Sequence, residues 1–273
     1  MSDALSDEQL EADLAFAIQA AREAGARALG LRESGRWEDP KIVGDVGDQA
    51  ADGFLQGFIR GRYPDDGLLS EETRDDAARC AIARAWIVDP LDGTKEFRTG
   101  REDWAVHVAL TFEGRPAIGV VALPSLGQVF WGICLPGRER SGVEGGDVHM
   151  LPGDSTGPDA IRIVCSRSHT PDWMQRFAEA IGPHELVPIG SVGFKSSRIL
   201  IGDADVYVHK TGLKEWDTCA PEGLARSQGW FVSRVDGSEQ LYNQADPYND
   251  ELVICRPAIK DKVLAALQRA VAE

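Results

Sequence analysis

The sequence predicts stacked α-helical and β-sheet layers, of mixed α+β and α/β class, and two observations support this class. In residues 1–155, two amphipathic helical patterns precede a series of short strand patterns, which is the order of an α+β unit. In residues 156–273, strand and helix patterns alternate, which is the order of an α/β unit. Residues 136–159 are rich in Gly, Pro and Asp, so we expect the boundary between two domains there.

The N-terminal half opens with two predicted helices. Ser6-Asp-Glu-Gln9 has the pattern of a capping box, and the apolar spacing after it predicts a helix to about Leu31. Similar spacing predicts a second helix from Asp48, which could be its N-cap, to about Arg62. A strand or loop follows at 68–72, and strands are predicted at 86–89, 104–112, 117–123 and 128–134, the last three as a meander.

The C-terminal half alternates between the two kinds of pattern. Strands are predicted at 161–165, 186–189, 205–209, 230–233 and 252–255. Helices are predicted at 171–181, 192–201, 218–228 and 258–271. This order favours a sheet covered by helices.

The composition restricts the class of partner. The formal net charge is −15, because 44 Asp and Glu outnumber 29 Lys and Arg, so nucleic acid polymers and anionic membranes are poor partners. A small phosphorylated substrate fits this charge if bound cations reverse the local field. No apolar run approaches the ~20 residues that span a bilayer, and the acidic N-terminus lacks a secretory pattern. We therefore expect a cytoplasmic protein.

The strongest local motif is Asp89-Pro-Leu-Asp92-Gly-Thr94, which follows a short apolar strand pattern. A carboxylate at the end of a buried strand is costly unless a cation meets it. Two carboxylates and the Leu91 carbonyl would form a set of hard oxygen ligands of the kind that Mg²⁺ prefers. Gly93 allows close backbone approach, and amide groups at the start of a helix can hold a phosphate oxygen. A lone motif of this kind could equally be an Asp-rich turn with a helix cap.

Other acidic residues strengthen the metal interpretation. Glu71 and Glu72 are adjacent at the end of a predicted strand, where alternation allows only one to face a given site. Asp217 stands where an N-cap would precede a helix, and Asp48 has the same explanation available. One metal cluster accounts for these positions more economically than a separate structural role for each.

Other phosphatase and nucleotide-binding chemistries fit less well. Haloacid-dehalogenase phosphatases use Asp-x-Asp-Gly-Thr, whereas Asp89 and Asp92 are separated by one residue more, which counts against an aspartyl-phosphate intermediate. The sequence has no Cys-x₅-Arg phosphate loop, no Gly-x-Ser-x-Gly elbow and no P-loop. The five cysteines include no Cys-x-x-Cys pair, which argues against a zinc site.

Three segments together resemble the inositol monophosphatase superfamily: Ser-Glu-Glu at 70–72, Trp-Ile-Val-Asp-Pro-Leu-Asp-Gly-Thr at 86–94 and Trp-Asp at 216–217. The similarity covers nearly the whole chain. Lys95-Glu96-Phe97, Ser-Arg-Ser-His at 166–169 and Asp-Gly-Ser at 236–238 resemble its 3'(2'),5'-bisphosphate nucleotidase branch, the CysQ type.

The resemblance implies a five-layer αβαβα sandwich with an N-terminal metal-site domain and a C-terminal domain that completes the substrate site. It implies hydrolysis assisted by two or three Mg²⁺ without a covalent intermediate, and inhibition by Li⁺. The implied metal ligands are Glu71, Asp89, Leu91 through its carbonyl, Asp92 and Asp217. Asp48 would bond Thr94, and Thr94 with Glu71 would orient the attacking water.

The resemblance also implies substrate contacts from Gly93, Thr94, Lys95, His169, Ser191 and Lys195. His169 could equally be structural, Lys195 could be a solvated surface lysine, and Lys214 is a rival for the phosphate contact. The implied reaction is removal of the 3'-phosphate from 3'-phosphoadenosine 5'-phosphate or its phosphosulfate, in sulfur assimilation. An inositol monophosphatase or fructose-1,6-bisphosphatase, and a non-catalytic phosphonucleotide-binding regulator, are the alternatives. The resemblance is compatible with a homodimer.

Overall fold

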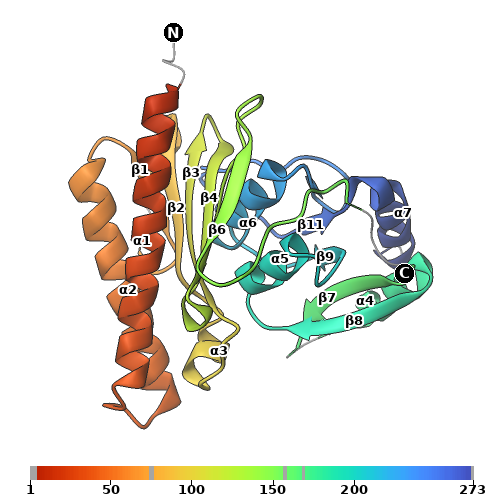
Figure 1. The fold of residues 1–273 in the computed structure, drawn as a ribbon, viewed down its shortest axis with the longest axis horizontal. Helices are drawn as coiled ribbons and strands as arrows, with labels where there is room; N and C mark the ends of the chain where they lie inside the picture. Colours follow the sequence, from red (N-terminus) through yellow and green to blue (C-terminus); the bar gives the residue numbers. More distant parts are fainter. Residues whose placement is uncertain (1–4, 74–76, 156–158, 168–169, 272–273) are drawn as a thin grey trace.

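A computed structural model describes residues 5–73, 77–155, 159–167 and 170–271. The described chain forms five layers in the order helices, sheet, helices, sheet, helices (Figure 1). The predicted αβαβα sandwich is therefore confirmed. The domain boundary at residue 155 stays a prediction, and the middle helices contact both sheets.

The first helical layer consists of α1 (Asp7–Glu33) and α2 (Pro40–Arg62), which lie side by side on the outer face of the first sheet (Figure 1). Ser6 caps α1 as predicted, because its hydroxyl accepts a hydrogen bond from the Gln9 amide. Asp39 caps α2 and Pro40 occupies its first turn. The prediction that Asp48 begins this helix is wrong, because glycines of low helix propensity in the first turns obscured its apolar period.

The first sheet has six strands in the order β1-β2-β3-β4-β5-β6. β1 pairs parallel to β2, and the later neighbours are antiparallel. The strands are β1 (Gly67–Ser70), β2 (Arg84–Asp92), β3 (Ala105–Phe112), β4 (Arg115–Leu123), β5 (Gln128–Ile133) and β6 (Arg140–Glu144). The short helix α3 (Thr94–Arg98) follows β2. β6 was not predicted, because its half-buried edge-strand sequence has no apolar alternation.

The middle layer holds α5 (Val192–Leu200) and α6 (Glu215–Ser227) between the sheets (Figure 1). The second sheet has the order β10-β11-β9-β7-β8. Its strands are β7 (Ile161–Ser166), β8 (His184–Ile189), β9 (Val206–His209), β10 (Phe231–Ser233) and β11 (Leu252–Cys255). The helices α4 (Asp172–Ile181) and α7 (Lys260–Val271) form the outer layer. No described helix is long and apolar enough to cross a membrane.

The start of α6 differs from the prediction. The helix begins at Glu215, so Asp217 lies inside its first turn and is not the N-cap. The Asp217 carboxylate instead accepts the Lys214 amide at 2.7 Å, as the third residue of a capping box does. The helix therefore fixes Asp217 close to its N-terminus.

Candidate metal and phosphate site

Three carboxylates converge where the first sheet meets the middle helices. One oxygen from each of Asp89, Asp92 and Asp217 lies within 4.8 Å of the others. The regular pairing of β2 with β3 is interrupted between Asp89 and Asp92, and this bulge breaks the strand alternation that would separate the two side chains. The Asp89 carboxylate accepts the Leu91 amide at 2.9 Å, which fixes the bulge from within.

The cluster carries more negative charge than its protein partners balance. Burial, and then the charges of Glu71, Asp92 and Asp217, raise the pKa of Asp89 well above its ordinary value. Burial, and then Asp217 and Glu72, raise the pKa of Glu71 to about 7. Glu71 follows β1, and after burial its largest electrostatic partner is Asp217, whereas burial and then the charges of Asp52 and Asp45 raise the pKa of Glu72. Hard oxygen donors gathered in this way fit a divalent cation such as Mg²⁺.

Asp48 projects from the interior of α2 toward the same region. Its Oδ2 accepts the Thr94 hydroxyl at 3.4 Å, and that hydroxyl also lies 3.3 Å from the Leu91 carbonyl oxygen. The Asp48 Oδ1 atom is buried without a hydrogen-bond partner among the described residues. Burial, followed by Glu72 and Glu71, raises the pKa of Asp48 to about 8. A polar atom left unpaired in this way also fits an additional cation or an ordered water.

Asp92 differs from Asp89 because the protein neutralises it. The Val192 and Gly193 amides at the start of α5 donate to its two oxygens at 3.1 and 2.6 Å. His107 Nε2 lies 3.1 Å from Asp92 Oδ2, and His107 Nδ1 lies 3.0 Å from the Trp216 carbonyl. Burial opposes ionisation of Asp92, but His107, the Gly193 amide and the Ser191 side chain outweigh it and lower the pKa to about 2. His107, in turn, has a raised pKa, because Asp92 and the Trp216 carbonyl outweigh its burial.

The structure brings most of the expected substrate residues to this end of the cluster. Gly93 has a φ of +91°, and a Cβ there would lie 2.9 Å from the Ser191 Cβ, so the two backbone turns are in contact. Ser191 caps α5, and its hydroxyl accepts the Phe194 amide at 2.9 Å. Lys95 is exposed on α3. His169 lies outside the described residues.

Lys195 is 5% exposed, so the alternative of a solvated surface lysine is wrong. Its ammonium lies 5.4 Å from the centre of the Tyr207 ring. Burial lowers its pKa, although Asp92, Glu96 and Asp103 act in the opposite direction. Lys195 therefore lies between the carboxylate cluster and the second sheet.

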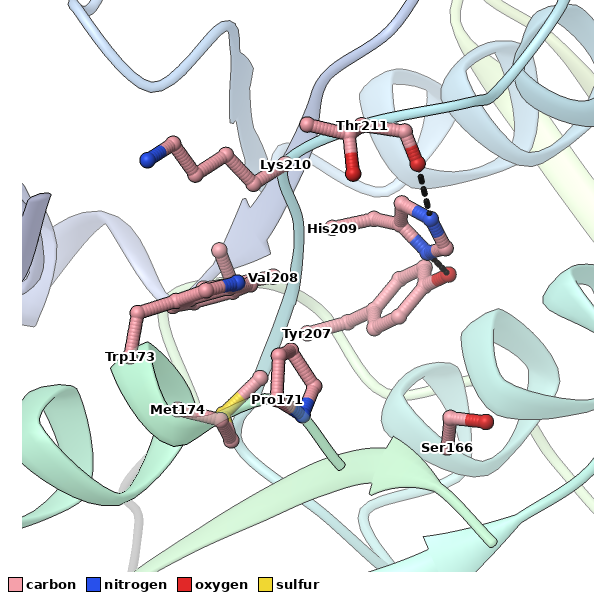
Figure 2. A pocket seen from close by; sticks show the side chains of 9 residues that line it. All are labelled: Ser166, Pro171, Trp173, Met174, Tyr207, Val208, His209, Lys210 and Thr211. Atoms are coloured by element: carbon pink, nitrogen blue, oxygen red, sulfur yellow. Dashed lines mark hydrogen bonds between the residues drawn. The ribbon is translucent and has the colours of Figure 1, made fainter. Parts of the chain in front are cut away.

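A cavity of about 250 Å³ opens beside Tyr207, at the carboxyl ends of β7 and β9 (Figure 2). Ser166, Trp173, Lys210 and His209 contribute to its lining, which includes no described carboxylate. His209 Nε2 donates to the Thr211 carbonyl at 2.9 Å, and Tyr207 donates to His209 Nδ1 at 3.1 Å. Burial, and then the charge of Lys195, lower the pKa of His209 to about 4, so its imidazole is neutral at pH 7.

Sequence reasoning assigned no role to His107 or Asp103. His107 interrupts an apolar run within β3, and this interruption is the one local signal of a buried polar contact. Asp103 precedes the same strand and has no comparable signal. Their partners are supplied by segments distant in the chain.

Comparison with known proteins places this fold and site in a class. The model of the inositol monophosphatase family matches residues 8–272, and the chain belongs to this family. Among solved structures, CysQ from Bacteroides thetaiotaomicron superposes with a TM-score of 0.79 at 27% identity, covering 90% of this chain and 97% of that one. An inositol monophosphatase from Anabaena superposes with a TM-score of 0.75 at 22% identity and covers 95% and 96%, which shows the shared fold alone.

Within the family, the curated relatives include bisphosphate nucleotidases. A protein from Mycobacterium leprae named 3'-phosphoadenosine 5'-phosphate phosphatase is 38% identical over 97% of this chain and 94% of its own. The 3'(2'),5'-bisphosphate nucleotidase CysQ of Salmonella typhimurium is 31% identical over 79% of this chain and 85% of its own. The predicted nucleotidase branch is therefore confirmed, and this chain is an enzyme of that branch.

Proposed function

We propose that this chain is a Mg²⁺-dependent phosphomonoester hydrolase that removes the 3'-phosphate of 3'-phosphoadenosine 5'-phosphate or of its phosphosulfate. The observation that carries the proposal is the convergence of Asp89, Asp92 and Asp217, of which Asp89 is buried without a compensating cation among the described residues. The names of the relatives at 38% and 31% identity support the nucleotide as substrate.

The metal ligands would be Glu71, Asp89, Asp92, Asp217 and the Leu91 carbonyl, holding two or three Mg²⁺. Bound Mg²⁺ would lower the pKa of a water molecule and neutralise charge that develops on the phosphoryl group. The protein prepares the site by keeping Asp92 ionised through His107 and the α5 amides. Asp89 lacks this compensation, so its charge is available to a cation.

The attacking water would be oriented by Thr94 and Glu71. Asp48 accepts the Thr94 proton, which leaves a lone pair of the Thr94 oxygen free to accept a hydrogen from water. Glu71, which follows β1, would accept the other water hydrogen in its ionised form. The Gly93 and Thr94 amides would hold a phosphate oxygen.

The nucleoside would extend from the cluster toward the second sheet. Lys195 and Ser191 would hold the second phosphate, and the cavity in Figure 2 would receive the base and ribose. The cavity is lined by the neutral His209 imidazole, the Trp173 indole and the Lys210 ammonium group. These groups suit an aromatic, negatively charged ligand better than the rest of this acidic chain does.

The proposal is tested by phosphate release from 3'-phosphoadenosine 5'-phosphate, inositol-1-phosphate and fructose-1,6-bisphosphate, each with Mg²⁺ and with EDTA. We expect EDTA to abolish release and the adenosine bisphosphate to have the highest kcat/KM. A preference for inositol or fructose phosphates would refute the proposed nucleotide substrate but would leave the proposed metal site in place. Binding of the nucleotide without turnover of any substrate would point to a regulator.

A further inference from the structure

The turn that joins β8 to α5, residues 190–193, is held by two carboxylates: Asp92 at the end of β2 and Asp103 in the loop before β3. Asp92 accepts hydrogen bonds from the Val192 and Gly193 amides at the C-terminal end of this turn. Asp103 accepts a hydrogen bond of 2.8 Å from the Gly190 amide at the N-terminal end of the turn. One of these anchors belongs to the carboxylate cluster, and the other does not.

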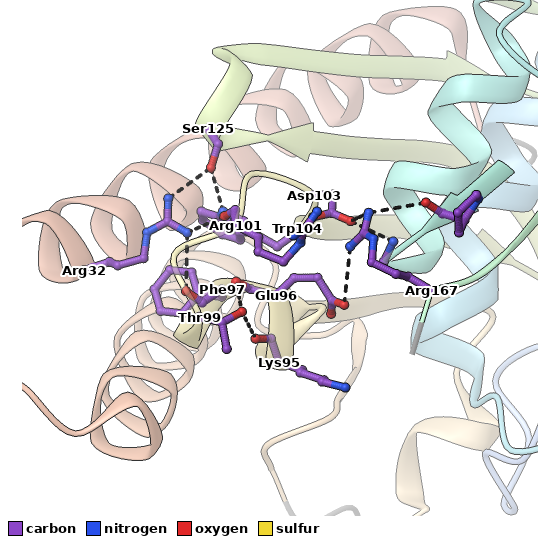
Figure 3. Close-up of polar contacts among 12 residues, drawn as sticks. Arg32, Lys95, Glu96, Phe97, Thr99, Arg101, Asp103, Trp104, Ser125 and Arg167 are labelled. Carbon is purple, nitrogen blue, oxygen red and sulfur yellow. Dashed lines mark hydrogen bonds and ion pairs between the residues drawn. The ribbon is translucent and has the colours of Figure 1, made fainter. Parts of the chain in front are cut away.

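Asp103 also binds the segment that follows β7. The Arg167 guanidinium lies 2.6 Å from Asp103 Oδ2, and Arg101 donates to Asp103 Oδ1 at 2.9 Å (Figure 3). Arg167 also lies 3.9 Å from Glu96 of α3. Asp103 is 6% exposed, whereas the side chains of Arg101 and Arg167 are 48% and 32% exposed. A carboxylate in the loop before β3 thus holds two separate segments of the C-terminal half.

Gly190 packs directly against the side chains of Glu96 and Asp103, so a displacement of either carboxylate would displace the 190–193 turn. A Cβ on Gly190 would lie 2.5 Å from the Glu96 Cγ and 2.7 Å from Asp103 Oδ2. The residue therefore allows the turn to rest directly on both acidic side chains. Glu96 is 7% exposed, so it contributes a buried wall to this contact.

We propose that Asp103 is a positioning residue that sets the place of Ser191 and Lys195, and thereby the affinity for the second phosphate of the substrate. Lys195 lies one helical turn after Ser191 on α5, so a shift of the 190–193 turn moves both side chains relative to the cluster. Asp103 is not among the clustered ligand atoms, so its loss acts on binding of the second phosphate more than on the chemical step. The inference rests on the proposed function.

The test compares Asp103→Asn with wild type on two substrates. For adenosine 3',5'-bisphosphate we expect KM to rise by about tenfold, the order expected when a charge-assisted hydrogen bond is weakened, with kcat within about threefold. For p-nitrophenyl phosphate, which has no second phosphate, KM should change by less than about twofold. Arg167→Ala should give the same split, and the double variant should be no worse than the more impaired single variant.

Two controls separate positioning from general stability. Arg101→Ala removes the exposed partner of the same carboxylate and should leave both KM values near wild type. Asp205→Asn weakens a buried carboxylate held by Arg162 and Arg256, at the end of β9 opposite the cavity, and should lower Tm without the KM split. If Asp103→Asn behaves as Asp205→Asn does, or raises both KM values equally, the inference is overturned.

Failure of the proposed function is visible in wild type alone. If wild type does not hydrolyse the adenosine bisphosphate but hydrolyses fructose-1,6-bisphosphate, the proposed substrate is wrong. The variant is then compared with wild type on the fructose bisphosphate and p-nitrophenyl phosphate. In either case, a rise in KM for the bisphosphate alone supports the inference, and an equal rise in both KM values overturns it.

Discussion

Replacement of Asp89 by Asn tests whether the cluster is built for a cation. Asp89 is 1% exposed, and burial together with the charges of the carboxyl groups around it raises its pKa well above the ordinary value; these groups are Glu71, Asp92, Asp217 and Asp48. Because the fold disfavours ionisation of this carboxyl group, Asp89 costs the metal-free protein folding free energy. Asparagine has the same shape without this cost.

We expect the metal-free Asp89→Asn variant to be more stable than metal-free wild type. Each kcal/mol of this gain raises Tm by roughly 2–4 °C for a chain of about this size. Wild type should in turn gain about 2.7 kcal/mol when Mg²⁺ is present at a hundredfold excess over its Kd, and the variant should lose most of this gain.

The assay is thermal unfolding at pH 7, in EDTA and over a Mg²⁺ titration, with phosphate release measured in parallel. Asp205→Asn is the matched control, because it should lower Tm in EDTA and keep the Mg²⁺ shift. Phosphate release by Asp89→Asn should fall by orders of magnitude, as it should for Asp92→Asn or Glu71→Gln. A variant that unfolds earlier than wild type in EDTA and retains the full Mg²⁺ shift would refute the reasoning.

Three further predictions follow from single contacts. Thr94→Ala should lower kcat by about 10²–10³-fold with little change in KM, whereas Thr94→Ser should retain most activity; equal loss in both, measured by steady-state kinetics, would contradict the hydroxyl role. Trp173→Ala should raise KM for the adenosine bisphosphate by about tenfold and leave p-nitrophenyl phosphate unaffected, and an unchanged ratio would remove the cavity from the substrate site. Arg162 and Arg256 outweigh burial and hold the pKa of Asp205 below 3.8, so its contribution to stability is present above that pH and is lost as pH falls through the lower folded value. Acid unfolding of Asp205→Asn should therefore show a shallower dependence on pH below about 4, and an unchanged slope would contradict this assignment.

The sequence by itself determined the features that depend on near neighbours. The capping box at Ser6, the meander of 104–134 and the Asp89-to-Thr94 motif are set by residues a few positions apart, and each gives a local pattern. The extent of α2 and the edge strand β6 were missed, because glycines and a half-buried edge weaken that pattern.

Tertiary structure alone decided which partners these residues meet. Asp92 is held by His107 from β3 and by amides at 192 and 193, while Asp103 meets Gly190 and Arg167. No period or spacing encodes such contacts, because they arise when five layers stack and bring distant segments together. The same stacking buries Lys195, and the low dielectric around it makes each pairing count for more than it would in water.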